Sequence, residues 1–289
     1  MKTKFDPLND YLFYKVMGEQ GDEVQLLGFL NAVLGRTGDN RFTSVEILEN
    51  KSFSAKMLGD KSSILDVRAI LQSSTKINVE VQLRNQHNID RRSLFYWSRE
   101  YAGSLAAGQD YSELPDVVSI NIVNFDFPDT RHFHSCFHLR EKSENEVILT
   151  NALEIHYLNM VRYRRQGRGK LADQGQSDPL SRWLAWLDAS SPPDLVTEAV
   201  KMDTAIQAAD ERMVYVTGDR EAIRAYEMRQ MALSDYTSSM NYARDKGHEE
   251  GREERDIEIA RSLLAKGSSP EFVQEITGLD MDIIRGLIE

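Results

Sequence analysis

Between residues 63 and 84 the chain alternates apolar and polar side chains, and this alternation constrains the fold more than any other feature. Two alternating runs, 63–71 and 76–84, are separated by the polar residues 72–75. Side chains along a β-strand point to opposite faces in turn, so each run predicts a strand with one apolar face. Because the polar connection is short, we expect the two strands to form an antiparallel hairpin.

The register of this hairpin decides which polar side chains come together. A register centred on Ser73 gives an odd-length loop, gathers the apolar residues of both strands on one face, and sets Asp66 opposite Glu80. Gln82 and Arg68 lie on the same polar face. This face is unusual because aspartate is depleted in strands, and Asp66 stands between apolar neighbours.

Two carboxylates directly opposed across a hairpin repel each other, and a divalent cation between them would remove the repulsion. Oxygen ligands suit Mg²⁺ or Mn²⁺, and such an ion can activate water for phosphodiester hydrolysis. An ordinary solvated sheet face, on which Asp66 pairs with Arg68 or Arg84, is the alternative from the pattern alone.

The rest of the chain supplies helices and further strands around this hairpin. Apolar spacing of three and four residues predicts helices, and β-branched or alternating runs predict strands. Helices are expected at 9–18, 23–34, 90–105, from 181, at 219–265 with interruptions at Gly247 and Gly251, and as a pair within 269–289; strands are expected at 117–125, 132–139 and 147–156. This order predicts an α/β fold with a mixed sheet flanked by helices and a helical C-terminal region. We expect a core over 1–165, a helical region over 166–255 and a small helical segment over 256–289.

Composition excludes several classes of protein. Cys136 is the single cysteine, which rules out a disulfide framework or a cysteine-rich zinc site. The sequence has no apolar run long enough to cross a bilayer, and its first residues do not read as a signal peptide, so we expect no membrane partner and a cytoplasmic location.

The net charge of −11 argues at first against a nucleic-acid partner. The excess of acidic residues is unevenly distributed along the chain, however. Residues 1–170 carry 22 Lys and Arg against 22 Asp and Glu, whereas residues 171–289 carry 13 against 24. The N-terminal part is therefore neutral, and bound metal ions would make its surface more positive.

Several segments resemble the Rpn family, the recombination-promoting nucleases or putative transposases of the PD-(D/E)XK superfamily. The order and spacing of these segments, which span most of the chain, are more specific than any one of them. The matching segments are 6–13 with Lys15, 29–34, 65–69, 78–82, 92–99 with Tyr101 and Gly108, and 277–279.

The resemblance implies a restriction-endonuclease-like core that cleaves DNA with Mg²⁺ or Mn²⁺. It gives Asp66 the place of the first metal-binding aspartate and Glu80 that of the acidic residue in (D/E)XK, with the backbone carbonyl of Val81 as a further metal ligand. Gln82 stands where the superfamily usually has lysine, as is typical of Rpn-like sequences. A neutral amide can only hydrogen-bond, so the metal would carry more of the water activation.

Other residues are candidates for supporting roles. Arg91 or Arg92, at the start of the helix after the hairpin, could supply positive charge to the phosphate. Family position suggests that Asp10 and Lys15 help the site, although helix capping and solvation explain them equally well. Tyr96 belongs to an aromatic group that is most simply core packing, and the less favoured alternative is that Tyr96 faces the catalytic side. Segment 154–160 departs from relatives at Asn159 and Met160, so no role is carried to it.

Two clusters lie outside the hairpin. His132, His134 and His138 share one strand face, but no set of partner ligands is evident from the sequence, which favours a polar sheet face over a metal site. A basic cluster could contact DNA phosphates or be ordinary exposed loop residues, with equal weight. Its members are Arg162, Arg164, Arg165, Arg168 and Lys170.

The C-terminal pair of short helices resembles a helix-turn-helix, but the last helix carries Asp280 and Asp282 against a single Arg285. Acidic side chains are poor DNA partners, so helix packing or self-association is favoured. The long charged helix makes a homodimer plausible. The sequence as a whole predicts a metal-dependent DNA endonuclease linked to recombination, mobile DNA or defence. The alternative is a catalytically inactive DNA-binding or assembly protein that keeps the nuclease fold.

Overall fold

The computed structural model describes residues 5–48, 67–72, 74–166 and 178–288. These residues divide into two compact units, 1–230 and 231–289. The sequence predicts different boundaries, after 165 and after 255, and that three-part division stays a prediction.

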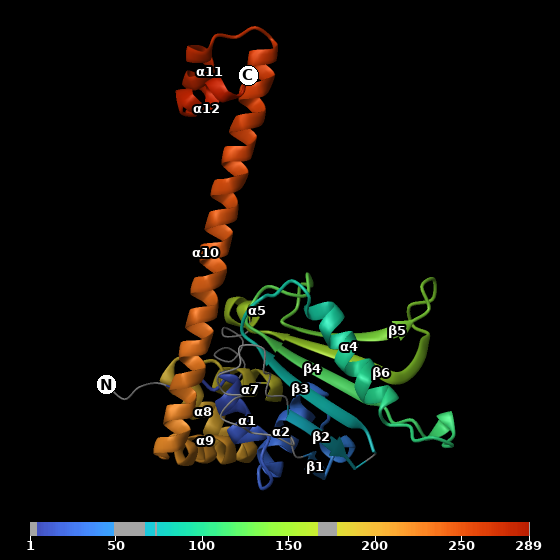
Figure 1. Ribbon diagram of the computed structural model, residues 1–289. Coiled ribbons are helices and arrows are strands. Elements are labelled where there is room, and N and C mark those ends of the chain that lie inside the picture. Colours follow the sequence, from blue (N-terminus) through green and yellow to red (C-terminus); the bar gives the residue numbers. More distant parts are fainter. Residues whose placement is uncertain (1–4, 49–66, 73, 167–177, 289) are drawn as a thin grey trace. The chain divides into compact units, whose positions relative to one another are not determined.

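A six-stranded mixed sheet forms the centre of the first unit (Figure 1). The strand order is β1-β2-β3-β4-β6-β5, with β3, β4 and β6 parallel and the remaining pairs antiparallel. The strands are β1 Val45–Leu48, β2 Val67–Leu71, β3 Lys76–Gln82, β4 Val117–Val123, β5 His134–Arg140 and β6 Ile148–Asn159. The hairpin and the strand pair β5–β6 are thus confirmed, whereas β1 was not predicted.

Helices cover both faces of this sheet. α4 (Ile89–Ala102) connects β3 to β4 and packs on one face, where Ile89 and Trp97 join a small core with Val123, Ile155 and Tyr157. The other face packs into the main core with α1, α2 and the helices after residue 178. These helices are α1 Asp10–Met17, α2 Glu23–Val33, α7 Pro179–Leu187, α8 Pro193–Met202 and α9 Thr204–Val216; α5 Met160–Gln166 follows β6, and short 3-10 turns lie at Gly38–Asn40 and Tyr111–Glu113.

Local sequence explains where these helices begin. The Asn9 side chain accepts a hydrogen bond from the backbone N–H of Leu12 at 3.2 Å and so caps α1. Asp178 caps α7 in the same way, and Pro179 occupies the first turn of that helix, where no N–H is needed. The mixed sheet flanked by helices, together with the helical C-terminal region, confirms the predicted fold class.

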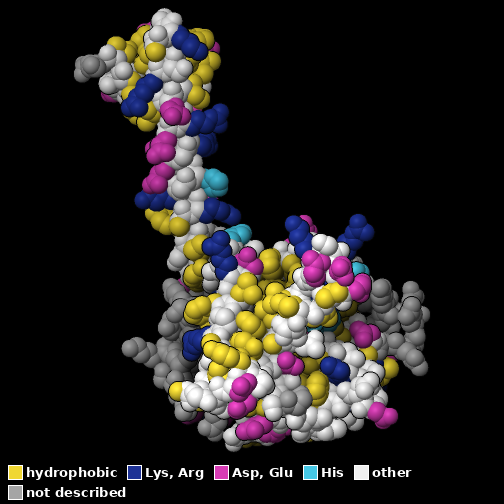
Figure 2. Space-filling model, turned by 90° about the vertical axis from the view of Figure 1, so that its right-hand side faces the viewer, with side chains coloured by type: hydrophobic (Ala, Val, Ile, Leu, Met, Phe, Trp, Pro, Cys, Tyr) yellow, Lys and Arg dark blue, Asp and Glu magenta, His cyan; other side chains and the backbone are white. Residues whose placement is uncertain are grey.

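The second unit consists of the later part of α10 (Arg220–Ala265) with α11 (Pro270–Thr277) and α12 (Met281–Gly286). A small core joins the three helices through Ala260, Val273, Leu279 and Ile284. Charged side chains of both signs lie along α10 (Figure 2). The predicted interruptions at Gly247 and Gly251 are wrong, because α10 is continuous through both. No helix among the described residues is both long and apolar enough to cross a membrane.

Candidate active site

The hairpin has the register that the alternation predicts. Val67 pairs with Val79, Arg68 with Asn78, and Ala69 with Ile77, so the ladder is centred on position 73. The sequence therefore predicts the register correctly. Asp66 itself lies outside the described residues, and Val67 is the first residue of β2 that the structure describes.

The two faces of β3 have different chemistry. Ile77, Val79 and Val81 point into the main core. Glu80 and Gln82 lie on the opposite face, toward α4, and are only 2 % and 7 % exposed. The alternative of an ordinary solvated polar face is therefore wrong at these two positions. A buried carboxylate and a buried amide on one strand demand partners, because burying unpaired polar groups costs free energy.

Arg92 of α4 is the charged partner of Glu80. Its guanidinium Nη2 lies 2.9 Å from Glu80 Oε1 and also stacks over the ring of Tyr96, whose centroid is 5.4 Å from the arginine Cζ. Burial raises the pKa of Glu80 above its ordinary value, and the positive charge of Arg92 opposes this only in part. The ionised carboxylate is therefore less favourable here than in water, although it has a cation beside it.

A row of polar side chains continues from Glu80 across the sheet. Asn121 of β4 is the neighbour of Glu80 in the ladder, and Tyr157 of β6 is the neighbour of Asn121. The Ser93 hydroxyl of α4 lies 2.9 Å from Asn121 Oδ1, and Asn121 Nδ2 donates to the backbone carbonyl of His156 at 3.2 Å. Burial also raises the pKa of Tyr157, and the negative charge of Glu80 contributes to the shift.

Sequence reasoning missed Ser93, Asn121 and Tyr157 as parts of this region. One signal was available in β4, where Ser119 and Asn121 alternate with apolar residues inside a strand that is buried on both faces. Polar residues at alternate positions of a fully buried strand predict a polar layer on one side of the sheet.

Several buried polar atoms in this layer have no hydrogen-bond partner among the described residues. They include both amide atoms of Gln82 and the hydroxyl of Ser119, together with Glu80 Oε1 and two guanidinium nitrogens of Arg92, whose ion pair lacks hydrogen-bond geometry. Buried polar atoms in folded proteins are nearly always paired with protein, water or an ion. The carboxylate of Glu80 and the free amide of Gln82 supply oxygen atoms of the kind that hold Mg²⁺ or its water ligands. The residues present therefore fit a hydrated divalent cation.

The other predicted supporting residues have contacts of their own. Asp10 is buried and bound by the guanidinium of Arg229, whose Nε lies 2.8 Å from Asp10 Oδ2. Lys15 forms an ion pair with Glu19, which lies just beyond the C-terminal end of α1. Arg68 reaches Glu100 at the far end of α4, at 2.6 Å. Arg91 is exposed on α4. A role for these residues in the site stays a prediction.

The basic cluster is distributed over α5 and the residues after it. Arg162 pairs with Asp126 at 2.7 Å, and Arg165 lies 3.4 Å from the same aspartate. Arg164 pairs with Asp188 at 3.2 Å. These ion pairs offset much of the positive charge locally. Arg168 and Lys170 lie outside the described residues, and DNA contact by the cluster stays a prediction.

Comparison with family models gives a match over residues 7–243 to the PD-(D/E)XK nuclease family transposases. Comparison with curated proteins gives no match, and neither does comparison with solved structures. The matched span covers most of the chain and includes both strands of the hairpin, α4 and the whole sheet. On this evidence the chain belongs to the PD-(D/E)XK nuclease family transposases.

Proposed function

We propose that this protein is a metal-dependent endonuclease that hydrolyses DNA phosphodiester bonds, with a role in recombination, mobile DNA or defence. The observation that carries the proposal is the buried carboxylate of Glu80 on β3, on the same face as the Gln82 amide, which has no hydrogen-bond partner among the described residues. Burying such groups costs the fold free energy, and buried ionisable groups with perturbed pKa values cluster at functional sites.

The cation would be held by Asp66, Glu80 and the backbone carbonyl of Val81. Asp66 directly precedes β2, whose described residues pair with β3 in the register centred on position 73. These are hard oxygen ligands, which suit Mg²⁺ or Mn²⁺ and leave positions for water and phosphate. When bound, the ion would supply Lewis acidity toward a phosphate oxygen and toward water.

The chain's own residues would position water and neutralise charge. The Gln82 amide oxygen would accept a hydrogen bond from the attacking water, because it is buried and has no other partner among the described residues. Arg92 neutralises Glu80 in the absence of an ion. If Glu80 held a cation, the guanidinium of Arg92 would instead bind a phosphate oxygen. DNA is therefore the proposed partner, and a homodimer through the charged helix is proposed with it.

Supercoiled plasmid DNA provides the test. We expect the pure protein to nick plasmid in Mg²⁺ or Mn²⁺ and not in excess chelator, and we expect Asp66→Ala and Glu80→Ala to remove nicking. Glu46→Gln is the matched control, because Glu46 is an exposed carboxylate on the neighbouring strand β1. Absence of nicking by the wild type, or equal nicking by the Asp66 and Glu80 variants, would contradict the proposal.

A catalytically inactive DNA-binding or assembly protein is the second candidate. The ion pair between Arg92 and Glu80 favours it, because the guanidinium occupies the carboxylate that a cation would bind. The neutral Gln82 in place of lysine points the same way. DNA binding that is independent of divalent cations, without cleavage at any concentration of Mg²⁺ or Mn²⁺, would identify this second function.

A further inference from the structure

A second group of metal-ligand side chains lies at the edge of the sheet, between β5 and β6. Cys136 and His138 are two residues apart on β5 and therefore share a face. In the antiparallel ladder Cys136 pairs with His156 and His138 pairs with Glu154. Cross-strand pairs point to the same side, so these residues form a compact group on one face of the edge hairpin.

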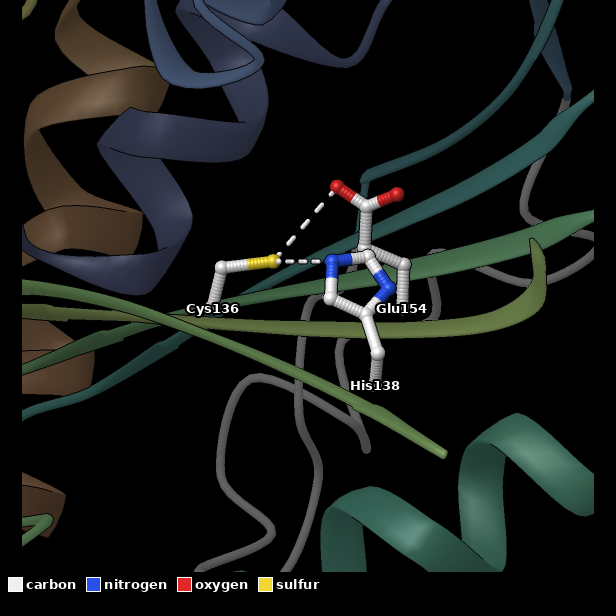
Figure 3. A group of neighbouring side chains, drawn as sticks. All are labelled: Cys136, His138 and Glu154. Atoms are coloured by element: carbon white, nitrogen blue, oxygen red, sulfur yellow. Dashed lines mark hydrogen bonds between the residues drawn. The ribbon is translucent and has the colours of Figure 1, made fainter. Parts of the chain in front are cut away.

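The donor atoms of three residues converge (Figure 3). Cys136 Sγ lies 3.2 Å from His138 Nε2 and 3.6 Å from Glu154 Oε1. One ligand atom from each of the three residues lies within 4.8 Å of the others. Tetrahedral zinc places a thiolate sulfur and an imidazole nitrogen roughly 3.5 Å apart, given its usual bond lengths. The distance of 3.2 Å between Cys136 Sγ and His138 Nε2 is close to this value.

Two histidines behind the group hold Glu154 in place. His156 Nε2 lies 2.6 Å from Glu154 Oε1, and His156 Nδ1 lies 2.8 Å from His134 Nε2. An ionised carboxylate can only accept, so His156 Nε2 donates to Glu154, and His156 Nδ1 shares a hydrogen bond with His134 Nε2. Such histidine and carboxylate chains orient metal ligands in other proteins.

A divalent cation bound here would be held by the Cys136 thiolate, and the thiol proton would be released to solvent. One soft sulfur, one imidazole and one carboxylate form a donor set typical of zinc rather than magnesium.

We infer that Cys136, His138 and Glu154 form a zinc site that joins the edge strand β5 to β6. His134 and His156 position the Glu154 carboxylate, and a water molecule or another small ligand completes the four-coordinate ion. This site is separate from the Glu80 region in its residues and in its ligand chemistry. It tethers a strand that has a neighbour on one side only.

Cobalt absorption provides the test, because Cys136 is the single cysteine and any thiolate-to-cobalt charge-transfer band must come from it. Untagged, full-length protein freed of metal is titrated with Co²⁺ and then with Zn²⁺. We expect a charge-transfer band that saturates at one Co²⁺ per chain, because only the cobalt bound to Cys136 gives it, and loss of the band as Zn²⁺ displaces that cobalt. Absence of the band at stoichiometric cobalt would overturn the inference.

Variants separate the ligands from their surroundings. Cys136→Ser should abolish the band, and His138→Gln or Glu154→Gln should weaken cobalt binding at least about tenfold. The matched controls are His132→Gln, an exposed histidine just before β5, and Glu80→Gln, which removes the other carboxylate site. Both controls should keep the band at wild-type affinity. An unchanged affinity in His138→Gln and Glu154→Gln would contradict the assignment.

A measurement on the wild type alone covers the case in which a variant fails to fold. Equimolar Zn²⁺ should slow alkylation of Cys136 by iodoacetamide at least about tenfold, because a metal-bound thiolate is a poor nucleophile when it is shielded by its ion. Equal alkylation rates with and without Zn²⁺ would overturn the inference independently of any substitution.

Discussion

The two carboxylates at the centre and at the edge of the sheet, Glu80 and Glu154, have opposite electrostatic environments. Burial raises the pKa of Glu80, in spite of the adjacent Arg92. A hydrogen bond from His156 lowers the pKa of the half-buried Glu154. The ionised form of Glu80 therefore costs the fold free energy, whereas that of Glu154 contributes to stability. The proposed catalytic role of Glu80 would explain why this carboxylate is kept at a cost to stability.

The largest expected effect on stability comes from removing the partner of Glu80. Arg92→Met leaves the Glu80 carboxylate buried without its cation, since the two side chains are only 14 % and 2 % exposed. We expect the free energy of unfolding at neutral pH to fall by about 3–5 kcal/mol. Urea denaturation followed by circular dichroism measures this change. Arg91→Met, which alters an exposed arginine on the same helix, is the control and should change little. A loss below 1 kcal/mol in Arg92→Met would show that Glu80 is compensated by other groups.

The next largest expected effect is on activity and concerns the side-chain amide of Gln82, which has no hydrogen-bond partner among the described residues. Gln82→Ala should slow plasmid nicking by about 10–100-fold, because the attacking water would lose an orienting hydrogen bond. The free energy of unfolding should change less in Gln82→Ala than in Arg92→Met, since Gln82→Ala leaves no buried charge without a partner. Asn78→Ala, on the same face of β3 and less buried, is the matched control and should nick like the wild type. Equal loss in both variants would indicate general damage to the strand.

The pH dependence of stability should have opposite signs at the two carboxylates. A raised folded-state pKa means that the native protein binds the Glu80 proton more tightly, so this contribution to stability is lost as pH rises above the ordinary value of 4.5. A lowered folded-state pKa means that the Glu154 contribution is present above 4.5 and is lost as pH falls below it.

Denaturation curves from pH 3.5 to pH 7, compared between wild type and each glutamine variant, measure these two contributions. Relative to Glu80→Gln, the wild type should become less stable with rising pH. Relative to Glu154→Gln, it should become less stable with falling pH. Two differences of the same sign would remove the distinction between the sites.

The smallest expected effect is that of Glu154→Gln at neutral pH without zinc. We expect a loss of about 1 kcal/mol or less, because the hydrogen bond from His156 lies at a partly exposed sheet edge. Adding Zn²⁺ should raise the thermal midpoint of the wild type more than that of Glu154→Gln, since the ion binds only the native state. If Zn²⁺ raised the thermal midpoints of both proteins equally, Glu154 would not be a zinc ligand.

Local patterns predicted the parts of the fold that local physics decides. Alternation fixed the hairpin register, because a shift by one residue would have turned Val79 and its neighbours out of the core. β1 was missed since Val45–Leu48 is short, and its pairing partners on β2 lie 20 or more residues along the chain. Gly247 and Gly251 were overinterpreted as breaks, although glycine in a helix is unfavourable rather than forbidden.

Contacts between distant segments explain what was missed at the sites. The ion pair of Arg92 with Glu80 depends on how α4 lies on the sheet, which periodicity does not specify. Likewise, the sequence shows the histidines of β5, but their partners Glu154 and His156 come from β6 through the ladder register. Strand pairing across 16 or more residues is decided by packing of the whole sheet.

The most direct test of the central claim is the nicking rate of Glu80→Gln in Mg²⁺, measured on protein whose unfolding free energy at pH 7 is known. We predict a rate at least about 100-fold below that of the wild type, in a variant that remains folded at pH 7, because a neutral amide cannot hold the cation as a carboxylate does. Glu46→Gln should match the wild type in both respects. Wild-type nicking by Glu80→Gln would contradict the account.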